Sequence, residues 1–345
     1  MPPSRHPLLF ASLWLLSLAA APLSRAQNSR VTEGVTHTLF KPSAINPESD
    51  PHFDEPHWVY VQRDIVVKHD ASLPADRHEL LLFIPGTQPP NLKEPEPGKV
   101  RVYASHAFCL TAASLGYHVI SLSYPNTISA SSCNKEADPE AFEKFRLSII
   151  QGGASPHVTV SRTNSIENRL IELLAVLAKR FPQEDWGAYR NADGSPKWEK
   201  IAVAGQSQGG GHAALIGIHH QVPRVLCFGA PKDYSIALQK PAAWYLKSGA
   251  TPKSAYFAFN HDQDRQGCTP AAQIENLKAL RLDQFGAPTY VDGASAPYGG
   301  AHILMTNYPG TKVDSSTAHG TMLSPKNKER FGDVWKYMLT AETKK

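Results

Sequence analysis

The feature that most constrains this chain is a glycine-flanked serine, Gly205-Gln206-Ser207-Gln208-Gly209, which lies between two segments of opposite character. The apolar run 201–204 before it predicts a buried strand, and the segment 210–216 after it predicts the start of a helix. Glycines on both sides of the serine allow a sharp turn, because side chains there would clash across it. Such a turn exposes the serine oxygen above the N-terminus of the helix.

Strand-like and helix-like segments alternate along most of the chain, which predicts an α/β fold: a mostly parallel sheet with helices on both faces. The sequence is 345 residues long and 41% apolar, enough for the core of one such domain. The expected strands are 58–61, 64–67, 80–84, 119–122, 201–204, 225–228, 255–259 and 302–306. The expected helices are 102–115, 139–150, 166–177, 210–216, 270–282 and 331–339.

The composition divides the chain into three parts. Residues 1–26 are expected to be a signal peptide, residues 27–56 a polar segment at the edge of the domain, and residues 57–345 the α/β domain itself. Within that domain, the connection 124–163 is long for a compact fold and contains one expected helix. Long connections of this kind often form lids or binding elements.

The first residues have the pattern of a secretory signal. A short polar start with Arg5 precedes an uncharged apolar run of about 14 residues from Leu8 to Ala21, and Ser24-Arg25-Ala26 carries small residues where a signal peptidase cleaves. The run is shorter than the roughly 20 residues that a membrane-spanning helix needs, and Pro22 ends it. We therefore expect cleavage after Ala26, a secreted or periplasmic location and no stable membrane anchor.

Charge and ligand spacing argue against two classes of partner. Without the signal, which contains Arg5 and Arg25 and no acidic residue, 33 basic residues stand against 31 acidic ones. The resulting net charge of +2 gives no reason to expect nucleic acid. The chain has 15 histidines but neither an H-E-x-x-H motif nor clustered Cys/His spacing, so no metal is expected.

The chain contains four cysteines, and export would permit disulfides. Of the three possible pairings, Cys109–Cys133 with Cys227–Cys268 is favoured, because each pair joins neighbouring segments of the expected topology. The alternative for Cys227, inside the apolar run 225–228, is a buried free thiol.

A serine hydroxyl is a weak nucleophile, so a nucleophilic Ser207 needs a histidine base and an acid that orients the base. After a turn of this type, the acid precedes the histidine in the chain. Asp264 is the favoured acid because it follows strand 255–259 at the carboxyl end, where active sites of open α/β sheets gather. Asp262 in the same loop and Asp233 after the preceding strand are the alternatives.

The favoured base is His319, in the expected loop between the last strand and the last helix. His302 opens that strand at its amino end, away from the edge where the site is expected. His219 and His220, at the far end of the helix that follows the serine turn, are expected at the surface. His212, in the same helix, is expected to pack or to hydrogen-bond locally.

Acyl transfer builds negative charge on an oxygen, which two preorganised N–H donors stabilise. The backbone N–H of Gln208, directly after the serine, is one expected donor. The second is expected from Pro85-Gly86-Thr87-Gln88, the loop after strand 80–84, where the N–H of Thr87 is favoured. The alternative is that this loop is an ordinary turn that ends the strand.

The loop Phe83-Ile84-Pro85-Gly86-Thr87, the serine turn 205–209 and the ordered pair Asp264 and His319 together resemble the α/β-hydrolase superfamily. The likeness covers roughly residues 57 to 341 and is closest to secreted bacterial esterases, lipases and polyester hydrolases with little or no cap domain. It implies the α/β-hydrolase fold and a serine hydrolase that cleaves small-molecule or polymeric carboxylic esters through an acyl-enzyme, with no cofactor. The connection 124–163 is longer than in minimal cutinase-like enzymes, and Gln206 replaces the His or Tyr that lipases often have.

Two alternatives stay open from the sequence. The same three residues serve peptide or amide hydrolysis and acyl transfer to another acceptor, which the sequence does not separate from ester hydrolysis. A non-catalytic binding protein on the same fold is the other alternative. Such proteins typically lack one of the three residues, and this chain retains all of them.

Overall fold

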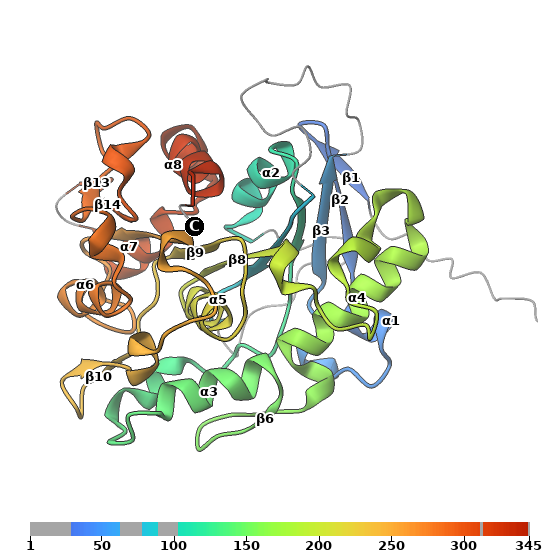
Figure 1. The fold of residues 1–345 in the computed structure, drawn as a ribbon, viewed down its shortest axis with the longest axis horizontal. Coiled ribbons are helices and arrows are strands. Elements are labelled where there is room, and N and C mark those ends of the chain that lie inside the picture. Colours follow the sequence, from blue (N-terminus) through green and yellow to red (C-terminus); the bar gives the residue numbers. More distant parts are fainter. Residues whose placement is uncertain (1–28, 63–77, 89–102, 311–312, 344–345) are drawn as a thin grey trace, which may run out of the picture.

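A computed structural model of the chain describes residues 29–62, 78–88, 103–310 and 313–343 (Figure 1). The signal segment 1–26 and the expected strand 64–67 lie outside these ranges. Within them, no helix combines the length and the apolar character that a membrane span requires.

The centre of the molecule is one sheet of ten strands in the order β1-β2-β3-β5-β4-β8-β9-β12-β14-β13. The pairs β1–β2, β2–β3 and β3–β5 are antiparallel, and all later neighbours in this order are parallel. The predicted mostly parallel sheet is therefore confirmed. The strands are β1 Arg30–Thr32, β2 Val35–Phe40, β3 His57–Gln62, β4 Leu80–Ile84, β5 His118–Ser121, β8 Ile201–Gln206, β9 Val225–Phe228, β12 Tyr256–His261, β13 Thr289–Tyr290 and β14 Ile303–Thr306.

Helices cover both faces of this sheet, as the sequence predicts (Figure 1). One face packs against α2 (His106–Ser114) and α8 (Lys328–Thr340). The core on the other face includes residues of α3 (Ala141–Ile150), α4 (Ile166–Arg180), α5 (Gln208–His219) and α6 (Pro270–Ala279). The smaller elements are α1 (Pro42–Ile45), α7 (Ser315–Thr321) and the hairpins β6 Gly153–Ala154 with β7 Thr159–Val160 and β10 Tyr234–Ser235 with β11 Lys240–Pro241.

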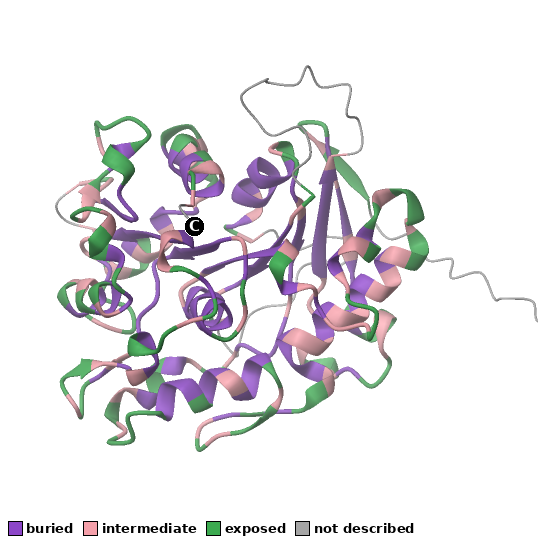
Figure 2. Ribbon diagram, viewed as in Figure 1, coloured by how far each residue is buried: buried purple, intermediate pink, exposed green. Residues whose placement is uncertain are grey.

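Strand β4 shows why the central strands have continuous apolar sequences. Leu80, Leu82 and Ile84 belong to the core on one face, whereas Leu81 and Phe83 belong to the core on the other. All five are buried, because helices exclude water from both faces of the strand. Figure 2 shows the same distribution over the molecule, with buried central strands and exposure concentrated on the outer sides of helices and loops.

Several expected boundaries shift in the structure. The helix expected at 102–115 begins at His106, and the one expected at 270–282 ends at Ala279, shortly before Arg281, whose φ of 63° is left-handed. In the N-terminal edge segment, β1 and β2 form a hairpin that extends the sheet beyond β3. The polar segment therefore contributes strands of its own to the sheet edge.

The connection 124–163 is packed onto the domain. It contains a 3-10 turn at Ala130–Lys135, helix α3 and the β6–β7 hairpin. Phe142, Phe145 and Ile149 of α3 are buried in the same core as the apolar residues of α5. The start of this connection is bonded to the first residue of α5, because the Gln208 side chain accepts the Ala130 N–H and donates to the Ile128 carbonyl.

The two expected disulfides are wrong, because all four cysteines have free thiols. Cys109 and Cys133 lie in the hydrophobic cores on opposite faces of the sheet, so their sulfur atoms cannot meet. Cys227 on β9 is a buried free thiol, which is the alternative that the sequence left open for it. Its S–H group donates to the carbonyl of Gly210 at 3.4 Å. Burial raises the pKa of the Cys227 and Cys268 thiols to about 12, so both stay protonated at neutral pH.

We expect all four thiols to react with Ellman's reagent when protein prepared without reductant is unfolded in guanidinium. In the native protein, the buried Cys109 and Cys227 should react far more slowly than the partly exposed Cys268. Intact mass after alkylation under non-reducing conditions gives an independent count. Finding two alkylated thiols, or none, would contradict the free-thiol assignment.

Candidate active site

Ser207 stands between the end of β8 at Gln206 and the start of α5 at Gln208. Its backbone angles, φ 53° and ψ −122°, are strained for a residue with a side chain, at a cost on the order of 1–3 kcal/mol. The surrounding structure holds this conformation. The Ser207 N–H donates to the Phe228 carbonyl at 2.8 Å, and the Ser207 carbonyl accepts the Gly211 N–H at 3.2 Å. The side chain is thereby presented, partly exposed, at the carboxyl end of a central strand.

Close packing explains the two glycines that flank this turn. A Cβ on Gly209 would overlap the carbonyl oxygens of Ile84 and Pro85 at the end of β4, and a Cβ on Gly205 would overlap the backbone of Gly209. The first turn of α5 therefore touches the ends of two neighbouring strands. A strained serine on a strand-to-helix turn, at the edge of a mostly parallel sheet in this strand order, has the geometry of a nucleophile elbow. This chain has the α/β-hydrolase fold.

No protein-family model and no curated protein matches the chain. Solved structures that it resembles include an S-formylglutathione hydrolase from Agrobacterium tumefaciens, at 10% identity and a TM-score of 0.42, with 90% of this chain and 98% of that chain covered. A bacterial heroin esterase is 16% identical with a TM-score of 0.37, and the match covers 89% of this chain and 85% of that chain. Thermogutta terrifontis esterase 2 is 11% identical with a TM-score of 0.37, and the match covers 86% of this chain and 94% of that chain. Because these similarities are low, the α/β-hydrolase fold is assigned from the sheet order and the elbow.

Asp264 and His319 meet at the edge of the sheet where Ser207 lies. Asp264 follows β12, and His319 lies in the short helix α7, where the sequence predicts a loop. That helix forms because the Asp314 carboxylate caps it, accepting the N–H groups of Ser316 and Thr317. His319 Nδ1 is 2.7 Å from Asp264 Oδ2. The Asp264 side chain is fully buried, and that of His319 is 11% exposed.

Opposing effects act on the Asp264 carboxyl group. Burial by itself raises its pKa, but the hydrogen bond and charge interaction with His319, together with the nearby Lys232, outweigh burial and hold the pKa below the usual value for an aspartate. Asp264 is therefore ionised at neutral pH, the form that accepts a hydrogen bond from His319 Nδ1–H. Its Oδ1 accepts the Gln266 N–H at 3.0 Å, so both carboxylate oxygens are bound.

The alternative acids have partners elsewhere. Asp262 accepts a hydrogen bond from the hydroxyl of Tyr290 at 3.1 Å, and Asp233 is bonded to the Arg146 guanidinium. Within the described parts of the chain, neither carboxylate hydrogen-bonds to His319. Of the three aspartates that the sequence leaves open, the structure thus brings only Asp264 to the histidine.

The alternative histidines have structural surroundings. The ring of His302 stacks on two phenylalanine rings, and its Nδ1 donates to a backbone carbonyl at 2.8 Å. His212 is fully buried, and burial together with the charge of Arg146 holds its pKa well below the usual value, so the ring is neutral. His219 and His220, at the far end of α5, lie beside the carboxylates of Glu143 and Glu167.

The two expected oxyanion donors flank Ser207. A Cβ on Gly86 would lie 3.2 Å from the Cβ of Ser207, so the loop 85–88 passes directly over the serine. Among the described residues, no hydrogen bond uses the backbone N–H of Thr87 or of Gln208. Both groups are therefore available to an oxygen that carries negative charge beside Ser207.

Side chains whose role the sequence did not indicate hold the loop 85–88 in place. The Tyr124 hydroxyl and the Asn126 amide donate to the first two carbonyls of this loop, at 2.8 Å and 2.7 Å. Oε1 of Gln208 accepts the Thr87 hydroxyl at 3.1 Å and a backbone N–H of the connection 124–163 at 2.7 Å. Hydrogen bonds from the connection 124–163 thus hold the loop that contains Thr87 in place. The side chain of Gln208, the other expected donor residue, links this loop to the connection.

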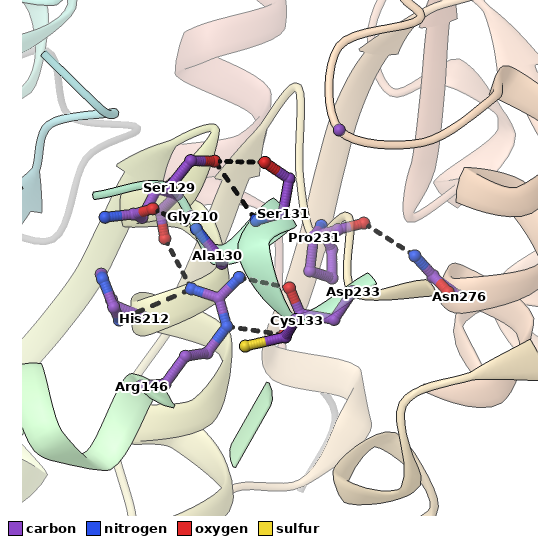
Figure 3. Close-up of polar contacts among 12 residues, drawn as sticks. Ser129, Ala130, Ser131, Cys133, Arg146, Gly210, His212, Pro231, Asp233 and Asn276 are labelled. Atoms are coloured by element: carbon purple, nitrogen blue, oxygen red, sulfur yellow. Dashed lines mark hydrogen bonds and ion pairs between the residues drawn. The ribbon is translucent and has the colours of Figure 1, made fainter. Parts of the chain in front are cut away.

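Arg146 and Asp233 form a buried ion pair (Figure 3). Two nitrogens of Arg146, on α3, bond the Asp233 carboxylate at 2.6 Å and 2.5 Å, and Nη1 donates to the carbonyl of Gln208 at 2.9 Å. Gly211 leaves room for the guanidinium, because a Cβ there would overlap it. Burial alone would lower the pKa of Arg146, but the Asp233 carboxylate raises it above its usual value. The pair joins the connection 124–163 to the loop after β9 and to the first turn of α5.

A cavity of about 640 Å³ opens beside Ser207 and His319, large enough for a small organic ligand. No hydrogen bond joins these two side chains in the described structure, and catalytic hydrogen bonds often tighten only in the substrate complex. Elsewhere in the described ranges, no three His, Cys, Asp or Glu side chains gather in a way that could hold a metal ion. The wall of the cavity combines apolar surface with polar side chains, which include Thr127, Ser129, Ser131, Gln206, Lys232 and Gln266.

We expect Gly209→Ala to lower the free energy of unfolding by about 1–3 kcal/mol or more, because its methyl group would overlap the carbonyl oxygens at the end of β4. Gly332→Ala in α8 is the matched control, since nothing lies within 4 Å of an added Cβ there. Alanine favours a helix over glycine, so the control should be as stable as the wild type or slightly more stable. Urea denaturation compares the three proteins. Equal stability of Gly209→Ala and wild type would show that the contact is not tight.

Proposed function

We propose that this protein is a serine hydrolase that cleaves carboxylic esters through an acyl-enzyme intermediate. The observation that carries the proposal is the strained Ser207 at a cavity whose wall includes His319, which is itself hydrogen-bonded to Asp264 at 2.7 Å. Backbone strain persists where the surrounding structure fixes it, and it concentrates at sites of chemistry. A nucleophile, a base and an orienting acid in this arrangement support acyl transfer.

In the first half of the reaction, the Ser207 oxygen attacks the carbonyl carbon of the ester while His319 Nε2 takes the hydroxyl proton. Asp264 accepts the Nδ1–H, which makes Nε2 the basic nitrogen of the neutral ring and stabilises the imidazolium that forms. The N–H groups of Thr87 and Gln208 stabilise the negative oxygen of the tetrahedral intermediate. His319 then gives its proton to the departing alcohol as the ester C–O bond breaks.

In the second half, water attacks the acyl-Ser207 ester. His319 takes a proton from that water, a second tetrahedral intermediate forms at the same two N–H donors, and its collapse breaks the bond to the serine oxygen. The carboxylic acid leaves, and the proton on His319 returns to Ser207. No step requires a cofactor.

The surroundings of Ser207 favour a small ester as the substrate. The cavity of about 640 Å³ has the size of a small-ligand pocket, and the packed connection 124–163 contributes part of its wall. Because the first residues have the pattern of a signal peptide that ends at Ala26, we expect this activity in the periplasm or outside the cell.

Replacing the nucleophile tests the proposal directly. We expect Ser207→Ala to reduce kcat/KM for p-nitrophenyl acetate by at least about 10³-fold, because the acyl-enzyme can no longer form. A fluorophosphonate probe should label the wild type and leave Ser207→Ala unlabelled. Ser132→Ala, at an exposed position in the same domain, is the control and should behave as wild type. Turnover at the wild-type rate by Ser207→Ala would refute the assignment of the nucleophile.

The acid is tested by a pair of matched substitutions. We expect Asp264→Asn to lower kcat/KM by about 10²–10⁴-fold, because the amide cannot stabilise the imidazolium as a carboxylate does. Asp262→Asn, two residues away and bonded to Tyr290 instead, should retain activity within a few-fold of wild type. The same ester assay compares them. The reverse order of effects would assign the acid to Asp262.

A further inference from the structure

Lys232 is a charged side chain of the cavity wall that the mechanism above does not use. It lies in the loop after β9, directly after Pro231, and its side chain is only 9% exposed. Its Nζ is 2.6 Å from Asp264 Oδ2 and donates to the carbonyl of Gln266 at 2.7 Å. The ammonium group therefore contacts the same carboxylate that orients the histidine.

The ammonium and the imidazole share one oxygen of that carboxylate. His319 Nδ1 lies 2.7 Å from the Oδ2 atom to which Lys232 is bonded, while Oδ1 accepts the N–H of Gln266. A rotation of the carboxylate that broke its bond to His319 would also break its bond to Lys232. Lys232 therefore holds Asp264 in the orientation that His319 needs.

The charge of Lys232 also acts on His319 itself. Two hydrogen bonds, of 2.6 Å and 2.7 Å, separate the ammonium from the imidazole, so a proton added to the ring meets a positive charge at short range. Asp233, the next residue, does not cancel this effect, because its carboxylate is bonded to Arg146. The Cys268 thiol nearby is protonated, so it adds no charge. Lys232 is thus a positive charge that lies across the carboxylate oxygen from the imidazole ring.

We propose that Lys232 is a positioning residue of the active site, which fixes the Asp264 carboxylate and keeps His319 in its basic, neutral form at lower pH. The inference rests on the proposed function, because the state of His319 affects a reaction rate only if His319 acts as the base. A lysine that only closed the loop around Gln266 would leave the pH dependence of the reaction unchanged.

The test is the pH profile of two reactions, hydrolysis of p-nitrophenyl acetate and labelling by a fluorophosphonate. We expect Lys232→Met and Lys232→Gln to move the acid limb of both profiles to higher pH by about one unit, as removal of a unit charge at this range implies. At pH values below the limb, this shift amounts to about a tenfold loss of rate. Lys232→Arg, which keeps the charge, should move the limb by no more than a few tenths of a unit.

Lys240→Met is the matched control, because Lys240 is exposed on β11, a few residues from Lys232. Its profile should superimpose on that of the wild type. Circular dichroism and urea denaturation establish that each variant is folded before its profile is measured. If Lys232→Met does not fold, the profile of Lys232→Gln alone tests the inference. This variant is expected to fold because its amide still supplies an N–H donor for the Gln266 carbonyl.

An acid limb at the wild-type pH in folded Lys232→Gln would overturn the inference about Lys232 alone. A wild type that neither hydrolyses the ester nor reacts with the fluorophosphonate would remove the proposed function and this inference with it. Because labelling needs only attack by Ser207, it also separates a failure of the nucleophile and base from a slow second half of the ester reaction.

Discussion

The contact between the first turn of α5 and the carboxyl ends of β4 and β8 is the constraint on which the site depends. It is so close that neither Gly205 nor Gly209 has room for a Cβ. The approach forces Ser207 into its strained conformation and places its side chain beneath the loop that carries Thr87. The positions of the proposed nucleophile and of both proposed oxyanion donors therefore follow from one packing contact.

Two buried ion pairs then connect the loops around the serine. Consecutive residues after β9 supply one partner each: Lys232 bonds Asp264, and Asp233 bonds Arg146 of the connection 124–163. The Trp244 indole N–H donates to the same Asp233 carboxylate at 2.9 Å. Removing one partner of a buried pair typically costs about 3–5 kcal/mol, because the other charge is left uncompensated. The loop after β9 therefore connects Asp264, the proposed acid, with the connection 124–163, which holds the loop 85–88 in place.

Buried parallel strands such as β4, β8 and β9 were predictable, because strands covered on both faces appear as continuous apolar runs that end at glycine or proline. Helix α7 was not, because residues 315–321 lack an apolar periodicity and the helix depends on the Asp314 cap. The disulfides failed for a different reason. Proximity along the chain says nothing about which face of the sheet a residue occupies, and Cys109 and Cys133 lie on opposite faces.

The sequence by itself determined the turn around Ser207 and the edge of the sheet at which the proposed site residues lie. The glycines around Ser207 specify the turn, and the order of strands, acid and histidine along the chain specifies the edge where they gather. Only the tertiary structure decided that Asp264, and not Asp262 or Asp233, meets His319, and that Lys232 binds the same oxygen. Loops of similar composition follow different paths at that edge, and hydrogen bonds between residues distant in the chain depend on those paths rather than on any local pattern.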